Sequence, residues 1–201
     1  MLVAEHHAGP QGKIGMAVPP IHTEPPSIWP EALRLCPGRP LPPYRRLPGH
    51  TPHPCKHPQG HRFGVDTALN VNPPWATCEA YRYGIDLYHQ GYLWESHEAW
   101  ESLWRVAGRD TIEGRFIQAL IRNSAALLKA HLGNRRGALT HSRAAHALLE
   151  QVAEEIGPGG TLLHVDVNDL LTSIGSCYRP LWEGGPLPVG PAPHILHRAL
   201  G

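Results

Sequence analysis

Residues 94–104, with the sequence WESHEAWESLW, place one histidine and three glutamates among three tryptophans. His97 and Glu101 are four positions apart, so on a helix their side chains lie one turn apart and can converge on one point. Such a pair can form a buried hydrogen bond, act in general acid–base chemistry or supply two ligands to a divalent metal. Because a helix this aromatic should bury one face, its acids need partners there. His97 and Glu101 are therefore the candidate catalytic residues, and a structural hydrogen bond between them is the alternative.

The other two glutamates of this stretch are expected elsewhere on the helix. Glu95 and Glu98 lie two positions before and one position after His97, and residues so close in sequence do not share a helix face. We expect them on a solvated face or paired with basic residues such as Arg105.

Polar residues also interrupt the apolar stripes of the neighbouring predicted helices. Apolar residues recur at spacings of three and four, and His97, Asn123 and His141 each occupy one core-facing position in such a stripe. Buried polar groups need hydrogen-bond partners. The three residues therefore either meet in the core, where they fix the register of the helices, or share a ligand.

A metal site remains incomplete on the helical residues alone. His97 and Glu101 give two ligands, whereas zinc takes three or four. The HExxH pattern is absent, since Glu101 stands where the second histidine would be. Two histidines of the proline-rich region, His53 and His61, could complete a divalent metal site. The alternative is a rigid packed arm whose histidines are hydrogen-bonded or exposed.

The elements that position these residues are predicted to be helices. Residues 76–156 contain no proline, and their apolar periodicity fits four helices joined by short loops, which implies antiparallel neighbours. A fifth, shorter helix is predicted over 167–176. The expected fold is all-α, a compact antiparallel bundle of four to five helices with a Pro-rich irregular N-terminal arm. The four main helices are predicted over residues 76–90, 92–107, 110–132 and 135–156.

Composition divides the chain into four parts. Residues 1–39 are expected to be mostly disordered or irregular, and residues 40–75 to form a Pro/His-rich arm packed on the bundle. Residues 76–156 form the predicted bundle domain. Residues 157–201, again rich in glycine and proline, form a C-terminal extension with the short helix.

Charge and motifs exclude several classes of function. The formal net charge is +1, which gives no electrostatic case for nucleic acid or an anionic membrane. No apolar run is long enough to span a bilayer, and the first residues lack the pattern of a secretory signal. The four cysteines show no paired spacing and are read as reduced thiols, so a cytoplasmic protein is expected. P-loop, GxGxxG and GxSxG motifs are absent.

Two stretches, GYLWESHEAWESLWR and RFIQALIRNSAALLKAHLGNRRGALTH, resemble the bacterial domain of unknown function 309 family. Ala119 and Arg122 depart from it, standing where the family has glycine and glutamine. The resemblance implies an all-helical domain. It also implies that PPYRRLPGHTPHPCKHPQGHRFG, which resembles an extension of longer members, is ordered against the bundle. With the motif residues included, the candidate ligand-binding residues are His97, Glu98, Glu101, Trp104, Gln118, Arg122 and His141.

Three hypotheses for function follow. The leading one is a small cytosolic helical domain whose His/Glu/Trp cluster binds a small ligand or a protein partner, in a cleft near His97 and Glu101. The second is a metal-dependent hydrolase that uses these two residues with His53 and His61. The third is a purely structural polar core in a scaffold that forms homo-oligomers through its alanine-rich helix faces.

Overall fold

Five α-helices account for most of the described chain, which comprises residues 33–65, 69–189 and 192–198 of a computed structural model. The predicted all-α bundle is confirmed, with one small addition, an antiparallel hairpin of β1 (Thr161–Leu162) and β2 (Val165–Asp166). The predictions for residues 1–32 lie outside the described residues. A short 3₁₀ turn, η2 (Trp75–Thr77), precedes the helices. The helices are α1 (Glu79–His89), α2 (Leu93–Ala107), α3 (Ile112–His131), α4 (Arg135–Ile156) and α5 (Val167–Trp182).

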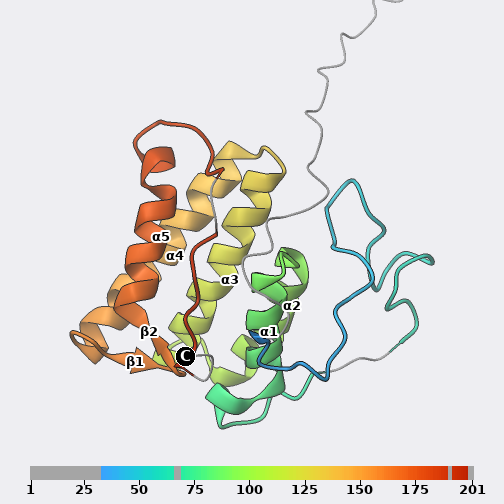
Figure 1. The fold of residues 1–201 in the computed structure, drawn as a ribbon, viewed down its shortest axis with the longest axis horizontal. Helices are drawn as coiled ribbons and strands as arrows, with labels where there is room; N and C mark the ends of the chain where they lie inside the picture. The colour runs from blue at the N-terminus through green and yellow to red at the C-terminus, as the bar shows by residue number, and fades with distance from the viewer. Residues whose placement is uncertain (1–32, 66–68, 190–191, 199–201) are drawn as a thin grey trace, which may run out of the picture.

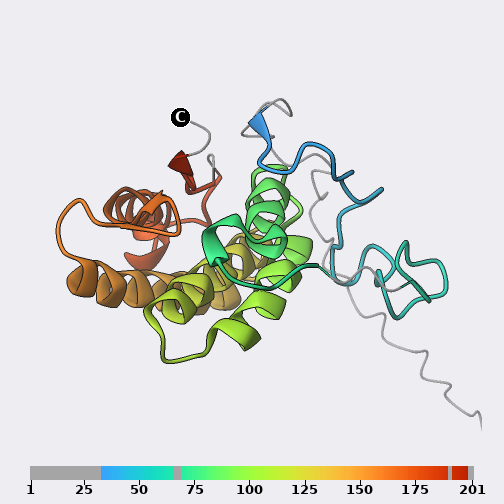
Figure 2. The ribbon, with the colours of Figure 1, turned by 90° about the horizontal axis from the view of Figure 1, so that it is seen from below.

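Each helix packs against its neighbours in sequence, α1 on α2, α2 on α3, α3 on α4 and α4 on α5. Figure 1 shows α3 in the middle, with α1 and α2 on one side and α4 and α5 on the other. The N-terminal segment, residues 33–65, lies beside α1 and α2 and away from α4 and α5 (Figures 1 and 2). In the described part of the chain, none of the helices combines the length and the apolar character that a membrane span needs.

Side-chain caps fix where three of the helices begin. The side chains of Thr111, Asn134 and Asp166 each accept a hydrogen bond from the backbone N–H three residues later, at the starts of α3, α4 and α5. These bonds satisfy N–H groups that have no partner inside the helix. Threonine, asparagine and aspartate are among the residues preferred at this position.

The last helix is longer than predicted, because it continues beyond residue 176 to Trp182. Tyr178 is fully buried, and the indole N–H of Trp182 donates to Ser142 Oγ of α4 at 2.8 Å. Pro180 is tolerated in the last turn, where its ring removes a single hydrogen bond. Packing on α4 therefore carries the helix past the point where its local sequence suggests an end.

Asn123 joins three parts of the core through hydrogen bonds. Its side chain is fully buried, and its amide donates to Tyr88 Oη at 2.8 Å. The Tyr178 hydroxyl donates to Asn123 Oδ1 at 3.1 Å, and the Tyr88 hydroxyl donates to the carbonyl of Pro193 at 2.7 Å. The core-facing position predicted for Asn123 is therefore found, and α1, α3, α5 and the C-terminal segment meet there.

The C-terminal segment, described over residues 192–198, is held against α1, α5 and the hairpin by histidine-rich contacts. The rings of His89 and His194 lie 5.5 Å apart, and those of His164 and His197 lie 5.2 Å apart. His197 also forms a β-bridge with Val165. Burial lowers the pKa of His89 to about 3 and that of His197 to about 4, so both are neutral when the segment is in place.

The close contact between α1 and α2 depends on a glycine. Gly84 lies inside α1 against the Trp100 ring, whose N–H donates to the carbonyl of Tyr81 at 3.2 Å. A Cβ atom added at Gly84 would lie 2.7 Å from Cδ1 and Cε2 of Trp100, a fully buried side chain. Because neither ring nor backbone has room to move in a close-packed core, the two helices need glycine here.

Gly84→Ala should lower the free energy of unfolding by about 1–3 kcal/mol, because the added methyl group overpacks this contact. Chemical denaturation of the two proteins measures the change. Gly175→Ala is the matched control, since a Cβ at that position of α5 would lie 3.6 Å from His146 Nε2, an ordinary contact. Equal effects of the two substitutions would contradict the close approach of α1 and α2.

Acid should destabilise the fold through His89. Its pKa is about 3 in the fold and about 6.5 in an unfolded chain, so the unfolded state takes up the proton first as pH falls. The free energy of unfolding should therefore fall by on the order of 2 kcal/mol between pH 6.5 and 4.5 on account of this residue. Denaturant titrations should show a shallower fall for His89→Gln than for the natural protein, and equal falls would contradict this role of His89.

Candidate functional site

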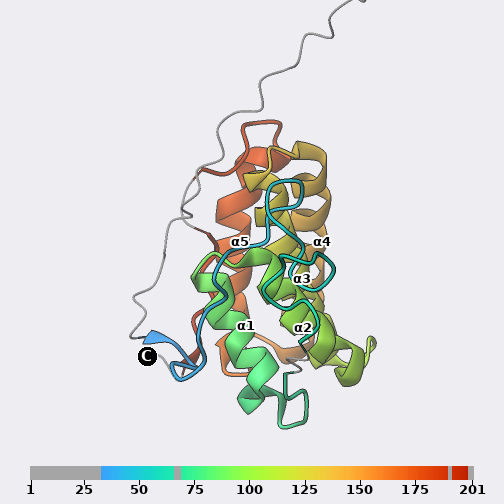
Figure 3. The ribbon, with the colours of Figure 1, turned by 90° about the vertical axis from the view of Figure 1, so that its right-hand side faces the viewer.

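One face of α1 binds the backbone of the N-terminal segment. Asp86 is buried, and its two carboxylate oxygens accept the backbone N–H groups of Leu35 at 2.7 Å and Cys36 at 2.8 Å. Arg82, one turn earlier, donates to the carbonyl of Leu35 at 2.6 Å, and Glu79 forms an ion pair with Arg39. Figure 3 shows the segment running across α1 and α2.

Two tyrosines continue this pattern toward the start of α2. The hydroxyl of Tyr83 donates to the carbonyl of Pro40 at 2.8 Å, and that of Tyr92 donates to the carbonyl of Pro42 at 2.9 Å. Proline carbonyls are accessible acceptors in an extended chain, which has no internal hydrogen bonds. The bundle therefore holds the proline-rich chain mainly by side-chain-to-backbone hydrogen bonds.

Glu95, in the first turn of α2, extends this set and is the acid that the sequence prediction misplaced. It is 7% exposed, and its Oε1 accepts the backbone N–H of Arg46 at 2.7 Å. Its Oε2 is buried and has no hydrogen-bond partner among the described residues. Burial raises the pKa of Glu95 to about 7. The expectation of a solvated face fails because the N-terminal segment covers this turn. Its position near the helix start, where carboxylates bind free N–H groups, was the available signal.

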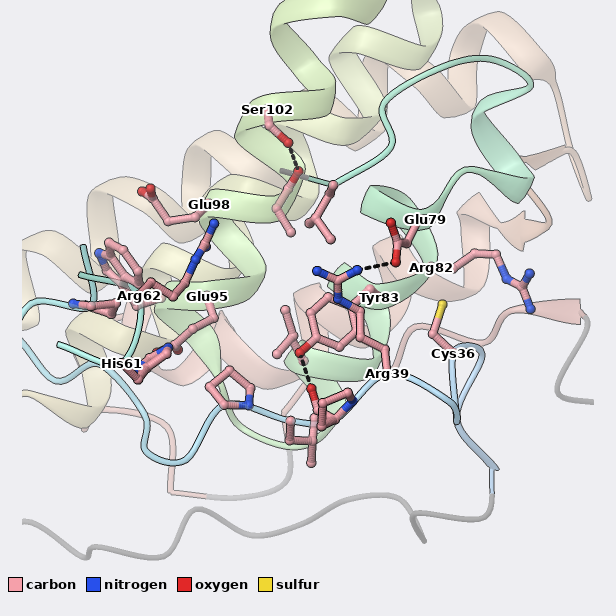
Figure 4. A pocket seen from close by; sticks show the side chains of 18 of the residues that line it. Cys36, Arg39, His61, Arg62, Glu79, Arg82, Tyr83, Glu95, Glu98 and Ser102 are labelled. Atoms are coloured by element: carbon pink, nitrogen blue, oxygen red, sulfur yellow. Dashed lines mark hydrogen bonds and ion pairs between the residues drawn. The ribbon is translucent and has the colours of Figure 1, made fainter. Parts of the chain in front are cut away.

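A cleft of about 970 Å³ lies between the N-terminal segment and helices α1 and α2 (Figure 4). Its apolar lining includes Leu35, Leu87 and Trp94. Glu101 lines it, but His97 does not, so only one residue of the predicted pair borders the cleft. The polar residues of α2 that line it are Glu95, Glu98, Glu101, Ser102 and Arg105.

His97 and Glu101 approach each other as their spacing suggests, and Glu98 joins them. His97 Nε2 lies 3.6 Å from Glu101 Oε2, and one potential ligand atom from each of the three residues lies within 4.8 Å of the others. Glu98 therefore does not project away from His97 as expected. Glu101 also accepts a hydrogen bond from Arg105 at 2.7 Å. His97, Glu98 and Glu101 are called the triad below.

The triad lies at the edge of the core and not inside it. His97 and Glu101 are about one-third exposed, whereas Trp100 and Leu103 are fully buried. The buried stripe of α2 is thus displaced by about one position from the predicted one, which placed His97 among core-facing residues. The N-terminal segment buries a second face of this helix. The three tryptophans of α2 therefore do not mark a single core-facing stripe.

The remaining candidates on the helices lie outside the cleft lining. Arg122 Nη1 lies 3.3 Å from His141 Nδ1, and these two residues connect α3 to α4. Burial, then the nearby Arg122 guanidinium, lowers the pKa of His141. Trp104 is half-buried with the Arg109 guanidinium 5.3 Å from its ring centre, and Gln118 is half-buried on α3. The predicted cluster is therefore divided between the triad and this Arg122–His141 contact.

The two candidate metal ligands of the proline-rich arm, His53 and His61, do not join the triad. His53 packs edge-on against Trp94 at 5.2 Å, and its Nδ1 accepts backbone N–H groups of its own loop. His61 packs against Tyr44 at 4.7 Å and lines the cleft, and both its ring nitrogens are buried without hydrogen-bond partners within residues 33–65, 69–189 and 192–198. Among the described residues, neither belongs to a group of three metal-ligand side chains.

Comparison with known proteins supports the resemblance noted in the sequence. Residues 81–141 match the model of a family described as Domain of unknown function (DUF309). The match runs from the buried Tyr81 of α1, through the triad, to His141 of α4, and does not include the N-terminal segment. No curated protein and no solved structure matches the chain.

Asp86→Ala should loosen the N-terminal segment, because it leaves two backbone N–H groups without their acceptor. The expected loss is about 1–3 kcal/mol, with faster hydrogen exchange at Leu35 and Cys36 and faster proteolysis of residues 33–65. Asp86→Asn, which retains one acceptor oxygen, should show a smaller effect. Substitution of the exposed Glu150 by Ala is the control, and exchange rates that do not distinguish it from Asp86→Ala would contradict this attachment.

Proposed function

We propose that this protein is a cytoplasmic domain that binds a small ligand in the cleft between the N-terminal segment and α1–α2. The chain carries a DUF309 domain, and because the description of that family assigns no activity, the proposal is based on the site. The observation that carries the proposal is the half-satisfied carboxyl group of Glu95 beside a cleft of about 970 Å³. A volume of this size is typical of small-molecule sites.

The lining supports ligand binding more than simple packing. A buried polar atom without a hydrogen bond destabilises a protein, so such atoms concentrate where a partner is supplied from outside. Glu95 and His61 both contribute such atoms on lining residues, while Leu87 and Trp94 supply apolar surface. Apolar walls with a few convergent polar groups are the usual composition of a ligand site.

A second candidate function is the binding of a divalent cation by the triad. Its ligand atoms lie within 4.8 Å of one another, and ligands on one zinc ion lie about 3.3–4 Å apart given bonds of about 2 Å. A closure of about 1 Å would therefore bring the three side chains onto one ion. Glu98 and Glu101 also line the cleft, so the cation would lie at its edge. In this form of the metal-dependent hydrolase hypothesis, the three triad residues are the metal ligands, and His53 and His61 are not.

Ligand binding in the cleft can be tested by filling it. Ser102 is half-buried on the cleft wall, and Ser102→Trp should occupy the space without disturbing the core. Fragments from a library of amines, alcohols and carboxylic acids that raise the melting temperature of the natural protein should lose that effect in Ser102→Trp. They should keep it in the control Thr140→Trp, an exposed position of α4. Fragments that stabilise both variants equally would remove the cleft as the site.

Cation binding by the triad can be measured by titrating the protein with Zn²⁺ or Mn²⁺ in a calorimeter. His97→Ala should weaken binding about tenfold or more, because it removes one of three ligands. His146→Ala is a matched control, since His146 and Glu150 form the same i,i+4 pair at 3.4 Å with no third ligand from the described chain. Similar affinities of the two variants would show that the metal binds elsewhere.

A further inference from the structure

The charged side chains that line the cleft differ in whether they have hydrogen-bond or ion-pair partners. Arg39 is paired with Glu79 and lies 5.0 Å from the centre of the Tyr83 ring, and Arg105 is paired with Glu101. Arg82 donates to a backbone carbonyl. These three arginines of the lining therefore already have defined acceptors.

Glu95 is a buried hydrogen-bond acceptor of the lining with one carboxyl oxygen left unsatisfied. Its Oε1 is occupied by the N–H of Arg46, and its Oε2 has no partner in the part of the chain that the structure describes, although the residue is more than nine-tenths buried. The guanidinium group of Arg46 does not fill this position, because it donates to the carbonyls of Leu47 and Thr51 within its own loop. The carboxyl group is thus held in place by the N-terminal segment but left with one oxygen unsatisfied.

A second unsatisfied group lies on the opposite wall. Both ring nitrogens of His61 are buried, and neither has a hydrogen bond to any residue that the structure describes. Figure 4 shows His61 and Arg62 on the N-terminal-segment side of Glu95 and Glu98. Burial and the neighbouring Arg62 lower the pKa of His61, so its ring is neutral and presents one acceptor nitrogen. An unsatisfied carboxyl oxygen and a neutral imidazole both accept hydrogen bonds from a cation.

We propose that the cleft binds a small organic cation, a primary ammonium or guanidinium group on an apolar body, with the cationic group hydrogen-bonded to Glu95 Oε2 and to the ring of His61. An ammonium group offers three N–H donors and no acceptor, so it can donate to an acceptor on each wall of the cleft. The inference rests on the proposed function and adds the chemical class of the ligand.

The rest of the lining suits the apolar body of such a ligand. Trp94, Leu87 and Leu41 line the cleft, and aromatic faces attract cations as well as apolar groups. Glu98, one turn after Glu95 on the same helix, adds a further carboxylate to the same wall. Both unsatisfied groups are covered by neighbouring side chains, so the ligand displaces these side chains as it enters.

Three probes of nearly one shape test the charge of the ligand: 2-phenylethylamine, 2-phenylethanol and 3-phenylpropionate, which are cationic, neutral and anionic at pH 7.5. Each is titrated into the full-length ¹⁵N-labelled protein, and the amide signals of Arg46, Glu95 and His61 are followed by NMR. The amine should shift these signals in a saturable manner and bind at least tenfold more tightly than the alcohol. The acid should not bind.

Variants then connect the preference to named groups. Glu95→Gln should weaken amine binding at least tenfold and leave alcohol binding within twofold, and Glu154→Gln, at an exposed position of α4, should change neither. Glu98→Gln, at an exposed side chain, provides a second variant should Glu95→Gln fail to fold, and it should weaken amine binding about threefold.

The inference is overturned if the alcohol or the acid binds the cleft as tightly as the amine, and the cleft then remains a ligand site of another class. It is also overturned if amine binding is insensitive to Glu95 and Glu98, or if none of the probes shifts the cleft signals. The fragment experiment with Ser102→Trp judges the cleft independently of these outcomes.

Discussion

Hydrogen bonds from helix side chains to the backbone of the N-terminal segment determine the shape of this side of the protein. Residues 37–58 contain eight prolines, which lack an N–H and fix φ, so the segment cannot satisfy its own backbone in a helix or a sheet. Asp86, Glu95 and Tyr83 supply the missing partners. Their spacing along α1 and α2 sets the path of the segment, and that path forms one wall of the cleft. The candidate site therefore exists because one part of the chain cannot fold alone.

The helices could be predicted because their signals are local. A proline-free stretch and apolar periodicity are properties of a few neighbouring residues, and the structure forms the helices that they indicate. The end of α5 could not be read in this way, since Trp182 is helical because it packs on Ser142, forty positions away. The partners of the proline-rich segment were equally hidden, because side-chain-to-backbone hydrogen bonds leave no periodic pattern in a sequence.

The candidate site shows the same division between local and tertiary information. The approach of His97 to Glu101 follows from helix spacing alone and is present at 3.6 Å. The burial of Glu95 depends on a segment about fifty positions earlier, so spacing along α2 could not reveal it. The contact of Arg122 with His141 joins α3 to α4, so the spacing along either helix alone could not reveal it. Side-chain pairs within one helix can be predicted from the sequence. Contacts between different helices can be identified only once their packing is known.

The attachment of the N-terminal segment also has a consequence for protein synthesis. Leu35 binds Asp86 and Arg46 binds Glu95, so each residue is made about fifty positions before its partner. At rates of about 5–20 residues per second, a nascent segment waits for seconds outside the ribosome before α1 and α2 follow it. An extended chain with free N–H groups would be prone to pair with other strands during that time. The prolines that oblige the segment to depend on later residues thus also protect it from aggregation until those residues are made.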